Sequence, residues 1–233
     1  MLAVVRRCHR WLMLFVGLQF LVWSLSGLYM VLIDIHSIHG ESFALKPQRS
    51  FSQLETLNYD IADLLTDYPA ATHINLSWLA DKAVYRFQFK GIKLVDASSG
   101  RPINTISKAL VREIALASLV EEREIRKIEL IIDDPPSEIG SRSLPLWRVD
   151  FVGVNSPSLY IDSTSGELLS VRQNTWRIFD LLWRLHIMDY YEGEDINNIL
   201  LNIVSISGFL AALFGLILLG FRLFKVKLKE SVK

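Results

Sequence analysis

Two short stretches of the sequence combine histidines with carboxylates, the residue types that bind transition metals and haem iron. The first, DIHSIHGE at residues 34–41, holds His36 and His39 at a spacing that lets both share one helical face. The second, RLHIMDYYEGED at residues 184–195, holds His186 followed by several carboxylates. Imidazole ligates such metals, and carboxylates orient it or bind beside it. These three histidines are therefore candidate metal or haem ligands, provided that the two stretches face each other.

A simpler interpretation is that these histidines are polar anchors at a membrane surface. His-x-x-His is a weak motif by itself, and Trp176 and Trp183 fit an amphipathic helix lying at the interface. His9 is separated from His36 by roughly 40 Å along a straight helix, so the two cannot share one iron. His9 would need a second copy or another subunit to complete a pair of ligands. Haem b is the cofactor that a redox role would imply.

Two long apolar runs define the elements that must position these residues. Residues 11–33 and 199–221 contain no charged residue, and about 20 apolar residues suffice to cross a bilayer core. We expect both to be transmembrane helices. Basic residues precede the first run and follow the second, which predicts that both termini are cytoplasmic and the middle lies outside. A signal peptide cleaved after Ser26 is the alternative, but the apolar run continues to Ile33, which favours an uncleaved anchor.

Small residues in the two runs predict where the helices contact each other. Each run contains Ser-x-Ser-Gly, as SLSG at residues 24–27 and SISG at residues 205–208. Small residues let helix backbones approach closely, and serine hydroxyls can bond across the contact. The residues expected at this contact are Ser24, Gly27, Ser205, Gly208, Ala212 and Gly215.

The segment between the runs shows helical and strand periodicities in a repeated order. Residues 52–68 have apolar positions at helical spacing, with Ser52 as an expected N-cap and Glu55 completing a capping box. Alternating segments at residues 72–78 and 83–89 predict a hairpin, and a short strand follows. A second helix at residues 107–122 is capped by Ser107 and has Leu110, Ile114, Ala117 and Val120 on one face. It precedes two strands at 124–133 and 144–154, and residues 158–171 close the unit. We therefore predict an α+β fold of two helix-plus-antiparallel-sheet repeats between two transmembrane helices.

Each repeat closes with nearly the same phrase, LVDASSGRPI at residues 94–103 and YIDSTSGELL at residues 160–169. The carboxylates of Asp96 and Asp162 can cap the turn that follows each strand, and Gly100 and Gly166 supply its glycine. The phrase therefore indicates a structural turn. The aromatic residues that alternate along the strands are expected to form core or an interaction surface: Trp78, Tyr85, Phe87, Trp147 and Phe151.

The helix-strand-strand unit ending in this phrase resembles the PepSY domain. The second copy fits the V-D-x-x-T-G-E-V-like ending of that family well, whereas the first has Arg101 and Pro102 where Glu and an aliphatic residue are usual. The terminal apolar runs resemble the membrane helices associated with PepSY domains. The resemblance implies a bacterial envelope protein, in a family linked to protease regulation and to iron- or haem-linked membrane reductases.

Composition limits the classes of function that fit the chain. The 25 basic and 25 acidic residues balance, which gives no sign of a nucleic-acid partner. Cys8 is the single cysteine, so paired-thiol chemistry within one chain is excluded. No motif for a catalytic nucleophile occurs, and no catalytic residue is assigned. The expected organisation is a basic N-terminus (1–10), a first membrane helix (11–34), two repeats (45–104 and 105–173), an interfacial helix and loop (175–197), a second membrane helix (198–221) and a basic tail (222–233).

These observations lead to one functional expectation and one alternative. The first is a two-pass protein of a bacterial inner membrane whose periplasmic domain binds or regulates other membrane or periplasmic proteins, or a second copy, without catalysis. The alternative is a haem- or metal-binding subunit of a membrane reductase or iron-uptake system. In both cases the lipid bilayer is a partner.

Overall fold

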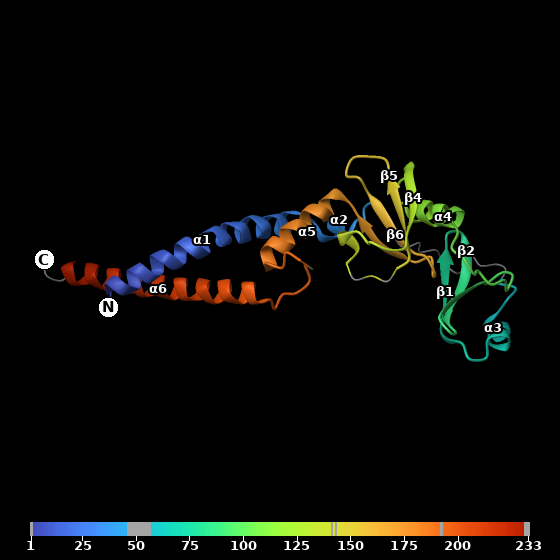
Figure 1. The fold of residues 1–233 in the computed structure, drawn as a ribbon, viewed down its shortest axis with the longest axis horizontal. Coiled ribbons are helices and arrows are strands. Elements are labelled where there is room, and N and C mark those ends of the chain that lie inside the picture. Colours follow the sequence, from blue (N-terminus) through green and yellow to red (C-terminus); the bar gives the residue numbers. More distant parts are fainter. Residues whose placement is uncertain (1, 46–56, 141, 143, 192, 231–233) are drawn as a thin grey trace. The chain divides into compact units, whose positions relative to one another are not determined.

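The structure, a computed structural model, describes residues 2–45, 57–140, 142, 144–191 and 193–230. The chain divides into two compact units. The helical unit consists of residues 1–34 and 178–233, and the sheet unit consists of residues 35–177 (Figure 1). The boundary between them falls inside one helix, α5 (Asn174–Ile187).

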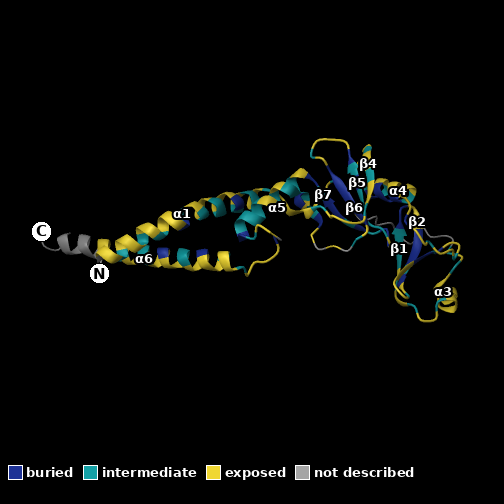
Figure 2. Ribbon diagram, viewed as in Figure 1, coloured by how far each residue is buried: buried dark blue, intermediate teal, exposed yellow. Residues whose placement is uncertain are grey.

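The helical unit contains α1 (Leu2–Leu32) and α6 (Ile199–Glu230), which pack side by side (Figure 1). Both are long and apolar enough to cross a membrane, over residues 3–32 and 199–223. Most of their large apolar side chains are exposed along the helices, as Figure 2 shows. Such exposure is costly in water and favourable in lipid. The length, composition and exposure of the two helices are consistent with a two-pass membrane protein.

The sheet unit contains two antiparallel sheets with a helix before each. The first sheet has the order β1-β2-β3 and the second has the order β4-β5-β6-β7, so the fold is α+β. The elements before and within the first sheet are α2 (Ile35–His39), α3 (Ile61–Asp67), β1 (Thr72–Leu79), β2 (Lys82–Gln88) and β3 (Ile92–Asp96). Those of the second are α4 (Lys108–Ser118), β4 (Ile125–Ile131), the 3-10 turn η2 (Ser137–Ile139), β5 (Leu146–Phe151), β6 (Ser158–Asp162) and β7 (Leu168–Arg172).

The first helix of the sheet unit is shorter than its sequence predicts. α3 begins after Asp60, whose carboxylate accepts hydrogen bonds from the amides of Ala62 and Asp63, while Asp63 completes a capping box. This reciprocal capping satisfies amides that have no partner inside the helix, which fixes the start at residue 61. Leu57 lies outside the helix, so the prediction that the helix already includes this residue is wrong. The expected cap Ser52 and its partner Glu55 fall outside the described residues.

α4 starts as the sequence predicts but buries a rotated face. The Ser107 side chain accepts a hydrogen bond from the amide of Leu110 and caps the helix. The fully buried positions are Val111, Ile114, Ala115 and Ser118. Of the predicted face, Ile114 is buried, Leu110 and Ala117 are half-buried, and Val120 lies beyond the helix with its side chain exposed. The helix ends at Ser118 because Leu119 turns into extended backbone and forms a β-bridge with Ala44.

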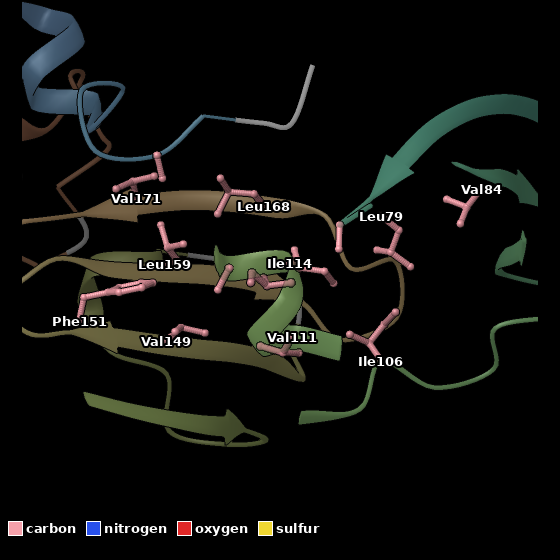
Figure 3. Packing of buried hydrophobic residues seen from close by; sticks show 14 of the residues in the cluster. Leu79, Val84, Ile106, Val111, Ile114, Val149, Phe151, Leu159, Leu168 and Val171 are labelled. Carbon is pink, nitrogen blue, oxygen red and sulfur yellow. The ribbon is translucent and has the colours of Figure 1, made fainter. Parts of the chain in front are cut away.

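One hydrophobic cluster joins α4 to the inner face of the second sheet and to residues of the first (Figure 3). Val149 and Phe151 on β5 and Leu159 on β6 face the helix, where Val111 and Ile114 meet them. A second cluster packs Leu64 of α3 against the first sheet. The aromatic residues that alternate along the strands are core: Tyr85, Phe87 and Phe151 are buried, and Trp78 and Trp147 are half-buried against the same clusters.

Candidate functional site

The four candidate histidines divide between the two units. His9 and His186 belong to the helical unit, whereas His36 and His39 belong to the sheet unit. His36 donates a hydrogen bond through Nδ1 to the Glu41 carboxylate at 2.8 Å, and both side chains are exposed. His39 lines a groove described below. Within the described ranges, no three His, Cys, Asp or Glu side chains lie close enough to hold a metal ion together.

His9 lies in the contact between the two long helices. Its Nδ1 is 2.9 Å from the carbonyl oxygen of Ala211 on α6. A carbonyl can only accept, so Nδ1 carries a proton, and in the neutral imidazole the lone pair is on Nε2. A Cβ at Gly215 would lie 3.1 Å from the Cε1 atom of His9. Glycine at position 215 therefore makes room for an imidazole between the helices.

His186 lies on α5, where that helix contacts α1 toward the other end of the helical unit. Its Nδ1 is 2.7 Å from the hydroxyl oxygen of Ser26, which is fully buried. Ser26 donates its single proton to a backbone carbonyl of its own helix, that of Val22 at 2.8 Å or Trp23 at 3.2 Å. The hydroxyl oxygen therefore accepts from Nδ1 of His186, and in the neutral imidazole the lone pair is on Nε2.

The C-terminal carbonyls of α5 are bound by side chains of α1 and of the loop before α6. The carbonyl of Leu185 accepts from Gln19 at 3.2 Å, and that of His186 accepts from the indole of Trp23 at 2.7 Å. The carbonyl of Ile187 accepts from Asn198 at 2.8 Å. The last carbonyls of a helix have no partner within it, and in apolar surroundings each must be satisfied. The last turn of α5 thus packs beside the apolar run of α1.

The contact between α1 and α6 follows a different face from the one the small-residue motifs predict. Gly208 and Gly215 do lie in the contact, near Val16 and His9 respectively. Ser24, Ser205 and Ala212 are exposed, and no atom lies within 4 Å of a Cβ built on Gly27. Their neighbours Ser26, Val204 and Ala211 are buried instead.

The reason is the spacing of the seam along each helix. One set of buried and half-buried positions on each helix recurs in alternating steps of three and four residues, which is the period of two helices packed along their length. On α1 these positions are Val5, His9, Leu12, Val16, Gln19, Trp23 and Ser26. On α6 they are Leu201, Val204, Gly208, Ala211, Gly215 and Leu218. Ser24, Ser205 and Ala212 fall outside this sequence of steps.

The two closing turns have the same hydrogen-bond geometry. The Asp96 carboxylate accepts from the amides of Ser98 and Ser99 at 2.9 and 3.1 Å. The Asp162 carboxylate accepts from those of Thr164 and Ser165 at 2.9 and 2.6 Å. Burial alone would raise the pKa of Asp96, but the hydrogen bonds from Ser98 and Ser99 outweigh it and lower the pKa.

Glycine is required at the end of each turn. Gly100 and Gly166 have φ angles of +67° and +64°, in the left-handed region, and each amide bonds to the carbonyl of the turn's aspartate at 2.9 Å. The carboxylates are thus committed to the backbone, and the phrase is structural in both repeats.

A groove of about 840 Å³ runs along β7. Its walls come from β7, from the segment following α2 and from the end of α4; the residues are His39, Glu41, Ala44, Leu45, Ala117, Ser118, Leu119, Val120, Leu168, Leu169, Ser170 and Val171. Successive side chains of a strand point to opposite faces, so a groove that touches four consecutive residues of β7 follows the edge of that strand. The hydroxyl of Ser170 is buried and has no hydrogen-bond partner in the described part of the chain.

The outer face of the second sheet carries an ionic network that the sequence analysis missed. Glu138, at the turn η2, accepts from Arg177 at 2.7 Å through Nε and at 3.2 Å through Nη2, and from the buried hydroxyl of Tyr160. Arg148 donates to Asp150 at 2.8 Å. Because Glu138 stands in a loop and its partners follow at residues 160 and 177, no local pattern in the sequence could reveal the pairing.

In this network the pKa of Glu138 is lowered, whereas the pKa of Tyr160 is raised. Burial alone would raise the pKa of Glu138, but hydrogen bonds from Arg177 and Tyr160 outweigh burial and lower the pKa. Burial and the hydrogen bond to Glu138 both raise the pKa of Tyr160. At neutral pH the network is therefore a carboxylate held by a guanidinium and a protonated phenol, which is a structural arrangement.

No protein-family model matches the sequence, and comparisons with curated proteins and with solved structures find no match. The structure itself shows an α+β protein with two antiparallel sheets in one unit and two membrane-compatible helices in the other.

Proposed function

We propose that the chain is a two-pass inner-membrane protein whose sheet unit is a PepSY-like, non-catalytic binding module on the periplasmic side. Support comes from the antiparallel pairing of two membrane-compatible helices and from the basic residues at both termini. The repeated helix-and-sheet order and the matching aspartate turns support the PepSY-like interpretation.

The groove along β7 is the observation that carries the binding function. It combines apolar walls with the outer edge of β7, the last strand of its sheet, and with the hydroxyl of Ser170, which has no hydrogen-bond partner among the described residues. An extended polypeptide segment can satisfy all three, because its backbone pairs with a strand edge while its side chains enter apolar pockets. The partner that we propose is therefore an extended, apolar segment of another membrane or periplasmic protein.

Photo-crosslinking from the groove in intact membranes tests this function. A photoreactive residue replaces Leu45, which lines the groove and is half-exposed, or Val154, which is 96% exposed outside it. A discrete protein adduct is expected from position 45 and not from position 154. Val120→Lys, at an exposed position on the groove wall, should abolish the adduct. Equal adducts from both positions, or adducts with lipid alone, would contradict the proposal.

Haem binding by the helical unit is the second candidate function, and the protonation of two histidines favours it. His9 and His186 both engage Nδ1 in a hydrogen bond, so in the neutral imidazole Nε2 is the nitrogen with the lone pair that a metal needs. The residues that they contact on α1 and α6 place them on the order of 25 Å apart along the helices, so they would ligate separate groups. Each would require a further ligand from another subunit or a second copy.

An absorption spectrum of the purified full chain in detergent decides this candidate. A Soret band that is lost in His9→Ala or His186→Ala, but kept in His73→Ala, would support haem binding. A colourless preparation after expression with excess haem would exclude it. The spectrum also tests His36 and His39, since His36→Ala and His39→Ala would remove the band if those residues were the ligands.

A further inference from the structure

Two adjoining cavities lie on the outer face of the second sheet, away from the helix α4. They have volumes of about 290 and 350 Å³, and both are lined by Pro136 and Arg148. The first is lined by three guanidinium groups and two carboxylates, those of Arg126, Arg148, Arg177, Glu138 and Asp150. The second is lined by three carboxylates and one guanidinium, those of Glu129, Asp133, Asp134 and Arg148. The pair of cavities thus has a basic end and an acidic end.

Arg126 reaches the basic end because β4 contains a bulge. The register between β4 and β5 shifts between Ile125 and Lys127, so Arg126 is the extra residue of the strand. A bulge redirects one side chain from the regular alternation. Arg126 and Lys127 are consequently both exposed, while Ile125 and Ile128 are both half-buried. No hydrogen bond or ion pair of Arg126 occurs within the described ranges, so its charge is available to a ligand.

The donors of the two other arginines are used very differently. Arg177 spends Nε, Nη1 and Nη2 on Glu138, Asn174, Ser158 and the carbonyl of Ser156. Arg148 spends only Nε, on Asp150, and its two Nη groups have no acceptor in the part of the chain that the structure describes. Arg177 therefore holds the wall of the cavity, whereas Arg148 and Arg126 present free donors to it.

The acidic end is similarly divided between paired and unpaired groups. Glu129 forms an ion pair with Lys127 at 2.6 Å. Asp133 and Asp134 make no ion pair or hydrogen bond with other described residues. Six consecutive residues, 129–134, line this cavity, so it follows the outer edge of β4, an edge strand of its sheet. Leu130 and Ile132 add exposed apolar surface along that edge.

We propose that this edge binds an extended polypeptide segment carrying an acidic residue and, four residues along, a basic residue. The acidic side chain meets the free donors of Arg126 and Arg148, and the basic side chain meets Asp133 and Asp134. Arg148 lies opposite Glu129, and β4 ends two residues later at Ile131, two residues before Asp133. Because an extended chain rises about 3.3 Å per residue, the two charged ends lie at most about 13 Å apart. Four residues of an extended ligand span the same length.

Charge complementarity and backbone pairing together favour a polypeptide. A lipid headgroup could match the charges, but it offers no backbone to the open edge of β4. The site lies at the opposite edge of the sheet from the β7 groove and does not depend on it. Each site can therefore fail in experiment while the other is retained.

Fluorescence anisotropy of the full chain in neutral nanodiscs tests the proposal. The probe is a fluorescein-labelled, C-terminally amidated peptide, Thr-Glu-Val-Thr-Val-Lys-Thr, which places Glu and Lys four residues apart. We expect Arg126→Glu to weaken binding by about tenfold or more, the factor that 1.4 kcal/mol represents. A peptide with Gln in place of Glu should bind weakly. Arg126→Glu should lower its affinity by less than about twofold, as expected in a double-mutant cycle when Arg126 pairs directly with the peptide's glutamate. Asp133→Asn should weaken binding through the peptide's lysine, so the loss of affinity should be the same for the Glu peptide and the Gln peptide.

Lys93→Glu provides the matched control, because Lys93 is an exposed basic residue on β3 that lies outside both cavities. It introduces the same change of charge and should leave the affinity unchanged. Equal losses with Lys93→Glu and Arg126→Glu, or equal losses with the Glu and Gln peptides, would overturn the proposal. So would the absence of peptide binding, including the case where Arg126 instead controls binding to phosphatidylglycerol vesicles.

Discussion

The hydroxyl oxygen of Ser26 lies 2.7 Å from Nδ1 of His186, and this contact joins α5 to the membrane-compatible helix α1. The neighbouring indole of Trp23 binds the carbonyl of the same histidine at 2.7 Å. The ring and the backbone carbonyl of His186 are thus both bound by residues of α1 that lie one turn apart. The contact explains why a polar residue is buried in an otherwise apolar helix.

Ser26→Ala is expected to destabilise the helical unit, because it leaves Nδ1 of His186 without an acceptor. Hydrogen bonds between membrane helices contribute about 0.6–1.7 kcal/mol, which sets the expected loss. The measurement is reversible unfolding of the full chain in mixed micelles. Ser24→Ala is the matched control, since Ser24 is exposed on the same helix. A loss from Ser24→Ala that equals the loss from Ser26→Ala would show that the bond contributes nothing.

Gly215→Leu is expected to separate α1 from α6, because a Cβ at that position already lies 3.1 Å from the His9 ring. Overpacking of a close contact costs about 1–3 kcal/mol. Gly220→Leu controls for helix propensity and apolar surface, since no atom lies within 4 Å of a Cβ at residue 220. The comparison uses the same unfolding measurement. If the two variants are equally stable, the His9 contact does not limit the approach of the helices.

The sequence predicts those features that local patterns encode. The two apolar runs, the Ser107 cap, the hairpin around residues 80–81 and the aspartate turns each depend on neighbouring residues, and the structure contains all of them. The contact face between the two long helices differs from the predicted one because small-residue motifs do not set which face of each helix lies in the contact. That face is set by side chains along the whole helix, including His9 and Trp23.

Features that join distant residues were not predictable in this way. The pairing of Glu138 with Arg177 joins a loop to a helix 39 positions later, and a loop glutamate gives no sign of burial. The placement of Arg126 follows from a bulge in β4, which the alternation of residues 124–133 conceals. The start of α3 at Asp60 was missed because an earlier Ser-x-x-Glu offered an equally good local cap.

The network around Glu138 is expected to make the sheet unit sensitive to acid. The folded state lowers the pKa of Glu138, so the unfolded state takes up a proton first as the pH falls. The stabilisation is therefore complete above the unfolded pKa of about 4.3 and is lost as the pH falls through the lower folded pKa. Urea unfolding followed by circular dichroism at a series of pH values measures this dependence.

Glu138→Gln is expected to lower stability at neutral pH by roughly 1–3 kcal/mol, because the partly buried Arg177 loses its counter-charge. The same variant should flatten the acid dependence below about pH 4.3. Glu129→Gln is the control, since its pair with Lys127 is about half-exposed and contributes little. An acid dependence that persists unchanged in Glu138→Gln would assign it to other carboxylates.

Gly166→Ala is expected to be more destabilising than Gly91→Ala, although both glycines have positive φ angles. The angles are +64° and +112°, and a side chain in such a backbone conformation costs about 1–2 kcal/mol. At residue 166 the added Cβ would also lie 2.5 Å from the Leu79 side chain and 3.2 Å from that of Ile114, whereas at residue 91 it would meet nothing within 4 Å. Because φ at residue 91 lies outside the left-handed region that L residues adopt, the backbone penalty there is at least as large as at residue 166. A greater loss from Gly166→Ala therefore reports the packing of the second closing turn against the core, and overpacking of this kind adds about 1–3 kcal/mol. Equal losses would mean that the glycine is needed for its backbone angle alone.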